Sequence, residues 1–408
     1  MKILHLAWRN VFRHTRRTLI TASAISVGLS AMILSNTMMN GADKMASENI
    51  IQYETGHMQI FAKGYYREEG IFPLDTIIEE PETIIQHVRT HRNVAGVTER
   101  VKFQARVNNG VDELPTLAYG IDIENDSEVF RIAQSVVDGA FLKEREDILI
   151  GTDLARDMGF AIGSYLTVIT KDRYGTYNAN DFFVSGLINT THPLFDRNAV
   201  LMKLEVAQQL LDLDHGVTEI CVRVRNSAQL ASAQRDITAL IGAKYEVYTW
   251  RELNAAIFEI SGFKRLSQFM IALVVLIIAA VGIVNTMLMA VMERIPEIGT
   301  LKAMGFRNNS IVQMFVLEGG IIGAFGSLLG CIFGVLMSLY VAIQGLDFSQ
   351  FFGDMDVGYP IKMIIKGEID FLTILLVFLF GVVVTILVSL WPVRMATRLE
   401  PVDALRHV

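Results

Sequence analysis

The stretch "ERIPEIGTLKAMGF" (residues 293–306) lies directly between two long apolar runs of a 408-residue chain. It is amphipathic and of mixed charge, and it is longer than a simple turn between two helices needs to be. Pro296 suits the first turn of a helix, and Glu297 suits the positive end of the helix dipole. Gly305 suits the end of such a helix. We therefore predict a short helix at about residues 296–304, within a connecting segment at 293–310.

The apolar runs around this segment predict membrane-spanning helices. Hydrophobic residues make up 51% of the chain, which is high for a soluble protein but low for a chain that lies wholly in a membrane. Stretches near or above the roughly 20 residues of a membrane span occur four times. We expect spans at 18–42, 251–292, 311–346 and 371–393. Because 251–292 is longer than one crossing, its outer part is expected to form a stalk continuous with the second span.

Basic residues predict the orientation of these spans. Five basic and no acidic residues precede the first span, and the 293–310 segment holds three basic residues. The connection at 347–370 is mainly acidic. The positive-inside rule therefore places both termini, the 293–310 segment and the 394–408 tail in the cytoplasm. Residues 1–17 fit either an amphipathic helix at the inner interface or a plain charge cluster that sets topology.

The long segment at 43–260 is expected on the outer side of the membrane. "GHMQIFA" (56–62) alternates like a strand, and "PETIIQHVRTH" (81–91) has helical spacing after a proline. The order of such patterns predicts an α/β part with a β-rich insertion at about residues 124–200. The expected fold class is an α-helical membrane protein with four spans and a large extracytoplasmic α+β domain.

The third expected span is rich in glycine. Small residues four apart allow close approach of helices in lipid, although glycine is also simply tolerated in membrane helices. The candidate packing positions are Gly319, Gly323, Gly326, Gly330 and Gly334. Glu318, near the cytoplasmic end of the same span, suggests either a charged partner or a side chain that reaches the interface.

Several kinds of chemistry leave no pattern in the chain. There is no phosphate-binding loop of the G-x-x-x-x-G-K-[ST] type, no H-E-x-x-H and no G-x-S-x-G. We therefore expect no ATP site, no catalytic residues and no cofactor in this chain. The two cysteines, Cys221 and Cys331, predict neither a disulfide nor a metal site. A net charge of −7 gives no indication of nucleic-acid binding.

Three membrane-proximal motifs resemble the FtsX/MacB-type family of ABC transporter permeases. "MERIPEIGTLKAMGFRNNSIVQMFVLEGGIIGAFGSLLG" (292–330) resembles the core of this family, with its E-I-[AG]-x-x-[KR]-A-x-G hallmark beginning at Glu297. "LAWRNVFRHTRRTLITASAISVGLSAMI" (6–33) and "PVRMATRLEPVDALR" (392–406) resemble the family's start and end. Within the family, "YETGHMQIFAKGYY" (53–66) is most similar to the lipoprotein-releasing LolC/LolE-like branch.

The resemblance implies an architecture, partners and a coupling site. The external domain would have an α/β porter part and a β-rich sabre part. Two permease chains would assemble as a homo- or heterodimer with two copies of a separate ABC ATPase, which would hold the ATP and magnesium. The segment that docks into a cleft of the ATPase would contain Glu293, Ile295, Glu297, Ile298, Gly299, Leu301, Lys302, Ala303, Met304 and Gly305. Lying on the inner lipid surface is the alternative for this helix.

The first functional hypothesis is a permease of the bacterial inner membrane that extracts lipoproteins, or similar lipidated substrates, from the outer leaflet. A periplasmic lipoprotein chaperone and membrane lipids would be further partners. Acyl chains would lie in a cavity between the first two spans, where flexible Met side chains suit variable chains. The candidate residues near its outer mouth are Met32, Ile33, Asn36, Met38, Met39, Phe269, Met270 and Leu273. Each of them could instead be an ordinary lipid-facing or packing residue.

Other functions remain open from the sequence. One is the permease of a tripartite system that exports drugs or peptides through an adaptor and an outer-membrane duct. Another is a transmembrane regulator of a cell-wall hydrolase, for which the external segment at 43–260 is large. A membrane enzyme is the fourth alternative, and no pair of carboxylates is singled out to support it.

Overall fold

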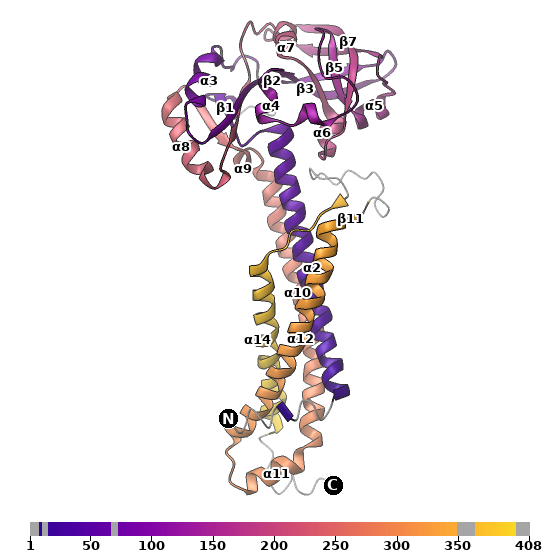
Figure 1. Cartoon of the computed structure of the whole chain (residues 1–408), viewed down its shortest axis with the longest axis vertical. Coiled ribbons are helices and arrows are strands. Elements are labelled where there is room, and N and C mark those ends of the chain that lie inside the picture. The colour runs from indigo at the N-terminus through magenta and orange to yellow at the C-terminus, as the bar shows by residue number, and fades with distance from the viewer. Residues whose placement is uncertain (1–7, 10–14, 67–71, 349–363, 397–408) are drawn as a thin grey trace. The chain divides into compact units, whose positions relative to one another are not determined.

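The computed structural model describes residues 8–9, 15–66, 72–348 and 364–396 of the chain. Some side chains within the helices, among them those of Leu301 and Ala303, also lie outside the description. The chain forms two compact units (Figure 1). The membrane unit contains Met1–Asp43, Ile260–Asp347 and Ile364–Val408, and the external unit contains Lys44–Glu259 and Phe348–Met363. Each unit is described below by itself.

Long helices build the membrane unit. They are α2 (Thr15–Asn49), α10 (Ala255–Glu293), α12 (Asn308–Gln344) and α14 (Phe371–Ala396), with the short α11 (Ile295–Ala303) between α10 and α12. In the described residues, three helices are long and apolar enough to cross a membrane, namely Thr18–Glu54, Asn308–Gln344 and Phe371–Met395. The predicted second span falls in α10, where only the shorter apolar segment Ala280–Glu293 is described.

Helix boundaries differ from the sequence prediction at both ends of the external unit. The span predicted at 18–42 lies within a longer helix, because α2 continues to Asn49 and then as a π-helix, η1 (Ile50–Glu54). The helix expected from residue 251 is interrupted. A separate turn, α9 (Trp250–Leu253), begins with a capping box in which the side chains of Thr249 and Glu252 accept hydrogen bonds from each other's backbone N–H. The turn ends at Asn254, whose N–H donates to the carbonyl of Trp250 at 3.2 Å, and α10 starts at Ala255.

The outer connection and the tails are described only in part. Two short strands, β11 (Leu346–Asp347) and β12 (Ile364–Ile365), pair antiparallel within the connection predicted as a loop. The predicted interfacial helix at 1–17 and the cytoplasmic tail at 394–408 lie largely outside the described residues.

The glycines of α12 lie where neighbouring helices approach most closely. A Cβ atom on Gly323 would stand 2.6 Å from the Cβ of Thr385 on α14. One on Gly330 would stand 3.0 Å from the Cβ of Leu29 on α2. Real Cβ atoms are very rarely this close, so these positions require glycine at the present helix separation. The other three make comparable contacts, Gly319 to α14, and Gly326 and Gly334 to α2.

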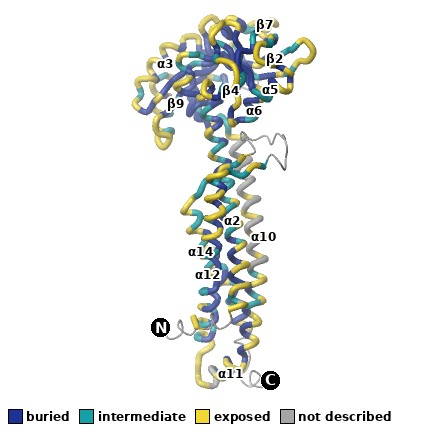
Figure 2. Tube along the Cα trace, turned by 45° about the vertical axis from the view of Figure 1, so that its right-hand side comes forward, coloured by how far each residue is buried: buried dark blue, intermediate teal, exposed yellow. Residues whose placement is uncertain are grey.

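The external unit begins with an α/β layer. Strands β10 (Tyr245–Thr249), β1 (Met58–Ala62) and β9 (Glu219–Val224) lie side by side and continue into β2 (Val94–Asn108). Helices α3 (Pro81–Arg89) and α8 (Leu230–Ile241) pack against β2 and β10 and against each other. The buried apolar positions of this layer are dark in Figure 2.

Six strands of the external unit pair in a closed ring. The order is β2, β3 (Glu113–Ile121), β8 (Ala199–Lys203), β5 (Asp147–Gly151), β7 (Tyr177–Ile188) and β6 (Tyr165–Lys171), and β6 pairs back to β2. A closed ring leaves no open edge between its strands. Around it lie β4 (Val136–Gly139), α4 (Asp126–Val129), η3 (Ile132–Ser135), α5 (Thr152–Met158), α6 (Pro193–Asn198), α7 (Leu204–Leu211) and η4 (Ser227–Gln229).

The β-rich part therefore extends beyond the predicted insertion at 124–200. Its ring takes β2 and β3 from before residue 124. The reason is that β2 is 15 residues long and serves two neighbours. Its first half pairs with β9 of the α/β layer, and its second half pairs with β3 and β6 of the ring.

A buried ion pair connects β2 of this ring to α4. Nε and Nη2 of Arg100 on β2 donate to Oδ1 of Asp126 on α4 at 3.0 and 2.7 Å. The guanidinium carbon lies 3.2 Å from the ring centroid of Phe130, and Nη1 donates to the carbonyl of Tyr53 at 3.4 Å. The two charged side chains are 0% and 3% exposed. The pair thus joins β2, α4 and the end of the first long helix.

Candidate functional site

The predicted coupling segment forms a separate helix, α11. Arg294 is its N-cap residue, Pro296 lies in its first turn, and Glu297 supplies an acidic side chain there. The helix ends at Met304, whose N–H donates to the carbonyl of Thr300 at 3.0 Å. Gly305 follows with φ +87°, a left-handed conformation that suits glycine. The helix predicted at 296–304 is thus present within one residue at each end.

One face of α11 is buried against the chain's own bundle. Ile298 packs in a cluster with Val291 of α10, Ile311 and Phe315 of α12, and Val393 of α14. Ile295 is likewise only 5% exposed. These two isoleucines were grouped with the docking residues on sequence grounds, but here they hold α11 to the membrane unit. A partner protein cannot reach them without displacing that packing.

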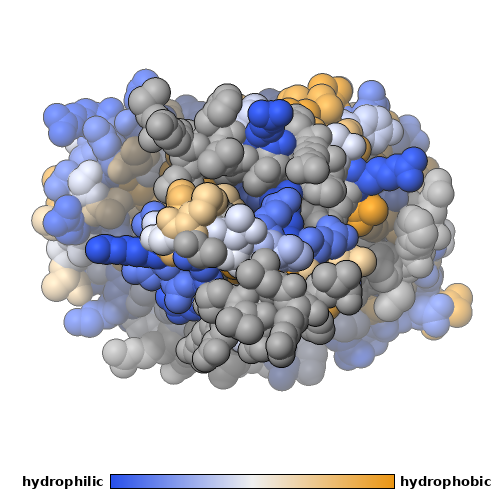
Figure 3. Space-filling model, turned by 90° about the horizontal axis from the view of Figure 1, so that it is seen from below, coloured by the Kyte–Doolittle hydropathy of each residue, from blue (hydrophilic) through white to orange (hydrophobic). Residues whose placement is uncertain are grey.

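The other face of α11 is open. Met304 is 64% exposed, and Phe306, which is not among the residues predicted from the sequence, is 49% exposed. Large apolar side chains in this position can fill a groove on a partner. Seen from the end that carries α11, the described side chains are mainly hydrophilic with single hydrophobic ones between them (Figure 3). The remaining candidates divide as follows: Glu293, Glu297 and Gly305 exposed, Lys302 half-buried, Gly299 buried, and Leu301 and Ala303 outside the description.

Glu318 has a charged partner. Nη1 of Arg294 lies 3.2 Å from Oε2 of Glu318, and their side chains are 8% and 2% exposed. This contact connects the junction of α10 and α11 to α12. Of the two alternatives that the sequence left for Glu318, the structure contains the ion pair.

The residues proposed to line an acyl cavity fall into two groups. Phe269, Met270 and Leu273 on α10 are 64%, 52% and 36% exposed. On α2, Ile33 is 1% exposed and packs on Gly334, so it is a core residue of the bundle. The other α2 candidates are half-buried, namely Met32, Asn36, Met38 and Met39.

The two groups lie at matching heights along adjacent helices. α2 and α10 run side by side in opposite directions (Figures 1 and 2), and Thr21 donates a hydrogen bond to Thr286 at 3.1 Å. Met38 lies about 17 residues beyond Thr21 on α2, and Phe269 lies about 17 residues before Thr286 on α10. Because both helices rise by about 1.5 Å per residue, these two residues lie at about the same distance from the hydrogen bond. Met38 and Phe269 therefore lie at the same height along the two helices.

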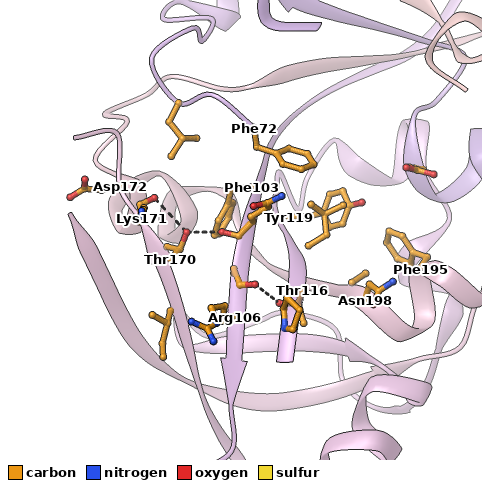
Figure 4. A pocket seen from close by; sticks show the side chains of 18 of the residues that line it. Phe72, Phe103, Arg106, Thr116, Tyr119, Thr170, Lys171, Asp172, Phe195 and Asn198 are labelled. Atoms are coloured by element: carbon orange, nitrogen blue, oxygen red, sulfur yellow. Dashed lines mark hydrogen bonds between the residues drawn. The ribbon is translucent and has the colours of Figure 1, made fainter. Parts of the chain in front are cut away.

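The external unit contains a cavity of about 980 Å³ that no sequence pattern predicted. Its volume lies at the upper end of the range for small-molecule sites, roughly 300–1,000 Å³. Figure 4 shows Phe103 and Tyr119 at its centre, with Phe72 close to them. Phe195 and Asn198 lie on one side, and Thr170, Lys171 and Asp172 lie on the other.

A compensated charge cluster borders this cavity. Glu54 lies 3.6 Å from Nε2 of His192 and 3.9 Å from Nζ of Lys102. Burial would raise the pKa of Glu54, but the His192 hydrogen bond and the Lys102 charge outweigh it and lower the pKa to about 2. The carboxylate is therefore ionised at neutral pH. A cavity lined by aromatic rings, with this charge cluster at its border, can hold an apolar or aromatic group of a ligand. Among the described residues, no group of His, Cys, Asp or Glu could hold a metal ion.

Comparison with known proteins covers nearly all of the chain. Residues 18–240 match the MacB-like periplasmic core domain, and residues 269–401 match the FtsX-like permease C-terminal domain. The chain is 23% identical to the lipoprotein-releasing system transmembrane protein LolC of Neisseria meningitidis serogroup B, over 96% of this chain and 94% of that protein.

Two further matches leave a large part of one of the two proteins unaligned. The macrolide export ATP-binding/permease protein MacB of Campylobacter jejuni is 22% identical, over 98% of this chain but only 60% of that protein. The crystal structure of the periplasmic region of MacB from Actinobacillus actinomycetemcomitans is 14% identical and has a TM-score of 0.35. That alignment covers 52% of this chain and 96% of the other.

Proposed function

Because the chain belongs to the FtsX/MacB-type family of ABC transporter permeases, we propose that it extracts lipoproteins or similar lipidated substrates from a membrane. The energy would come from ATP hydrolysis by a separate ATPase, of which two copies would bind two permease chains. The chain would lie in the bacterial inner membrane with four spans, the second formed by α10. Both termini would be cytoplasmic, and the external unit would be periplasmic.

The observation that carries the transport part of this proposal is the two-sided structure of α11. Ile298 fixes the helix to the bundle, whereas Met304 and Phe306 are exposed beside it. Exposed apolar side chains next to a helix that is held in place can serve as anchors in a groove of a partner. A helix that docks on an ATPase needs both faces, one to bind the partner and one to pass the force on.

The end-to-end similarity to LolC supports a lipidated cargo. Acyl chains would enter between α2 and α10, where Met38 and Phe269 lie at the same depth. No pore is needed in this scheme, because the cargo is already on the outer side of the membrane. Movement of α10 would pass to the external unit, which would hand the cargo to a periplasmic lipoprotein chaperone.

The similarity to a macrolide exporter favours a second candidate, the permease of a drug or peptide efflux system. In that case the external unit would bind an adaptor and an outer-membrane duct.

Purification of the tagged chain from its native membrane separates the two candidates. Lipoprotein extraction predicts co-purification of an ATPase, with ATP hydrolysis that rises on addition of a synthetic triacylated lipopeptide. Efflux predicts an adaptor and a duct protein among the partners, with stimulation by macrolides but not by the lipopeptide. Absence of any ATPase partner would contradict both.

A further inference from the structure

Arg294 joins three helices of the membrane unit. It is the single residue between α10 and α11. Its backbone N–H donates to the carbonyl of Val291 at 3.1 Å, and its carbonyl accepts from the N–H of Ile298 at 2.9 Å. Its side chain reaches Glu318 on α12 at 3.2 Å. Arg294 therefore connects the end of α10 and the start of α11 to α12 at Glu318.

Burial makes this contact different from the apolar contacts around it. The side chains of Arg294 and Glu318 are 8% and 2% exposed. Removing one member of such a pair leaves an uncompensated buried charge, whereas an apolar pair of similar size is often as stable as the ion pair. Stability alone thus gives no reason for charges here. What a buried polar contact can add is a fixed register between the elements that it joins.

The surrounding contacts do not fix that register. Ile298, Ile311 and Phe315 touch through apolar surfaces, which are non-directional and allow sliding. The hydrogen bond from Nη1 of Arg294 to Oε2 of Glu318, by contrast, is directional, so it favours one position of α11 along α12. Nη2 of Arg294 is buried without a hydrogen-bond partner, so the guanidinium is held through Nη1 alone among the contacts described.

We propose that the Arg294–Glu318 pair is the link that makes α12 move together with α11 when the ATPase displaces α11. This inference rests on the transport function proposed above and assigns positioning roles to two residues in it. Neither residue would touch ATP or cargo. Without the pair, α11 would still dock and the ATPase would still hydrolyse ATP, but the displacement would be lost by slippage along the apolar contacts.

The test measures displacement directly in the purified permease–ATPase complex in nanodiscs. Spin labels are placed at two exposed positions, Val111→Cys in the external unit and Asn309→Cys at the start of α12. The distance distribution is recorded with and without trapped ATP, and ATP hydrolysis is measured on the same samples. The variants are Glu318→Gln and the apolar pair Arg294→Met with Glu318→Leu. The matched control is Thr21→Val with Thr286→Val, which removes another polar contact between helices.

The apolar pair separates positioning from folding. It should assemble and hydrolyse ATP like the unchanged complex, yet most of the ATP-dependent shift in distance should be lost, because the contact that couples the two helices is gone. Glu318→Gln should lose the shift as well, and the threonine control should keep it. A full shift in the apolar pair would overturn the proposal, because the ion pair would then be only structural. No shift in the unchanged complex would contradict the transport function itself.

Discussion

Replacement of Asp126 by alanine should destabilise the external unit strongly. The change removes the carboxylate that accepts two hydrogen bonds from Arg100, at 3.0 and 2.7 Å, and leaves a guanidinium that is 0% exposed without its charge partner. Breaking a buried pair in this way typically costs about 3–5 kcal/mol of unfolding free energy. The stacking of Arg100 on Phe130 and its bond to the Tyr53 carbonyl keep the guanidinium from turning out to solvent.

Urea unfolding of the detergent-solubilised chain measures this cost. Trp250 is 7% exposed in the external unit and serves as the fluorescent probe once Trp8 and Trp391 are replaced by phenylalanine. Asp126→Ala should lower the midpoint with an unchanged denaturant slope. The control Glu144→Ala removes an exposed carboxylate and should stay within about 0.5 kcal/mol.

A double variant tests the reason for the cost. Arg100→Met with Asp126→Leu removes both charges, so it should unfold at a higher urea concentration than Asp126→Ala alone. If Asp126→Ala unfolded within about 0.5 kcal/mol of the unchanged chain, the pair would carry no stability and the reasoning would be refuted. A double variant less stable than the single one would show that contacts other than the charge balance dominate at Arg100.

Three further predictions follow from single positions. Met304→Asp should weaken binding of the ATPase by about tenfold or more in a titration, as for an apolar interface anchor, whereas Met304→Leu should not; equal affinities would show that this face does not dock. Gly330→Leu should lower the thermal stability of the solubilised chain by about 1–3 kcal/mol through overpacking against α2. The same change at Gly282, which has nothing within 4 Å, should not lower it, and equal losses would contradict close packing at Gly330. Burial, with the nearby charges of Asp122 and Glu82, raises the pKa of Glu99 from 4.5 to about 7. The folded chain then binds a proton that the unfolded chain has lost, so stability falls as pH rises from 4.5 to about 7. Glu99→Gln should therefore raise the melting temperature at pH 8 but not at pH 4, and a gain independent of pH would refute the assignment.

The helical parts were the most predictable from the sequence, because their signals are local. Pro296 and Gly305 mark the ends of α11 by chemistry that acts within one turn. The sequence predicted a span at 18–42 but not the length of α2, because polar residues after position 42 end the apolar run without ending the helix. The length of an apolar run indicates how much of a helix lies in the membrane. The helix itself ends only where its backbone hydrogen bonds end, which can be outside the membrane.

The faces of α11 and the ring of strands could not be predicted in the same way. Ile298 and Met304 are both apolar, and only the position of α12 decides which of them is buried. The pairing of β6 with β2 joins residues more than 50 positions apart, and strand patterns carry no information on partners at that distance. The sequence left open whether Glu318 has a charged partner, and nothing in it distinguished Arg294 from the other basic residues of the 293–310 segment.

Release of cargo from proteoliposomes tests the central claim most directly. The chain, its permease partner and the ATPase are reconstituted with a fluorescent triacylated lipoprotein, and the lipoprotein that passes to a soluble periplasmic acceptor is measured over time. We expect release that requires ATP hydrolysis and that is lost in Met304→Asp. ATP hydrolysis stimulated by the lipoprotein but without any release would contradict it.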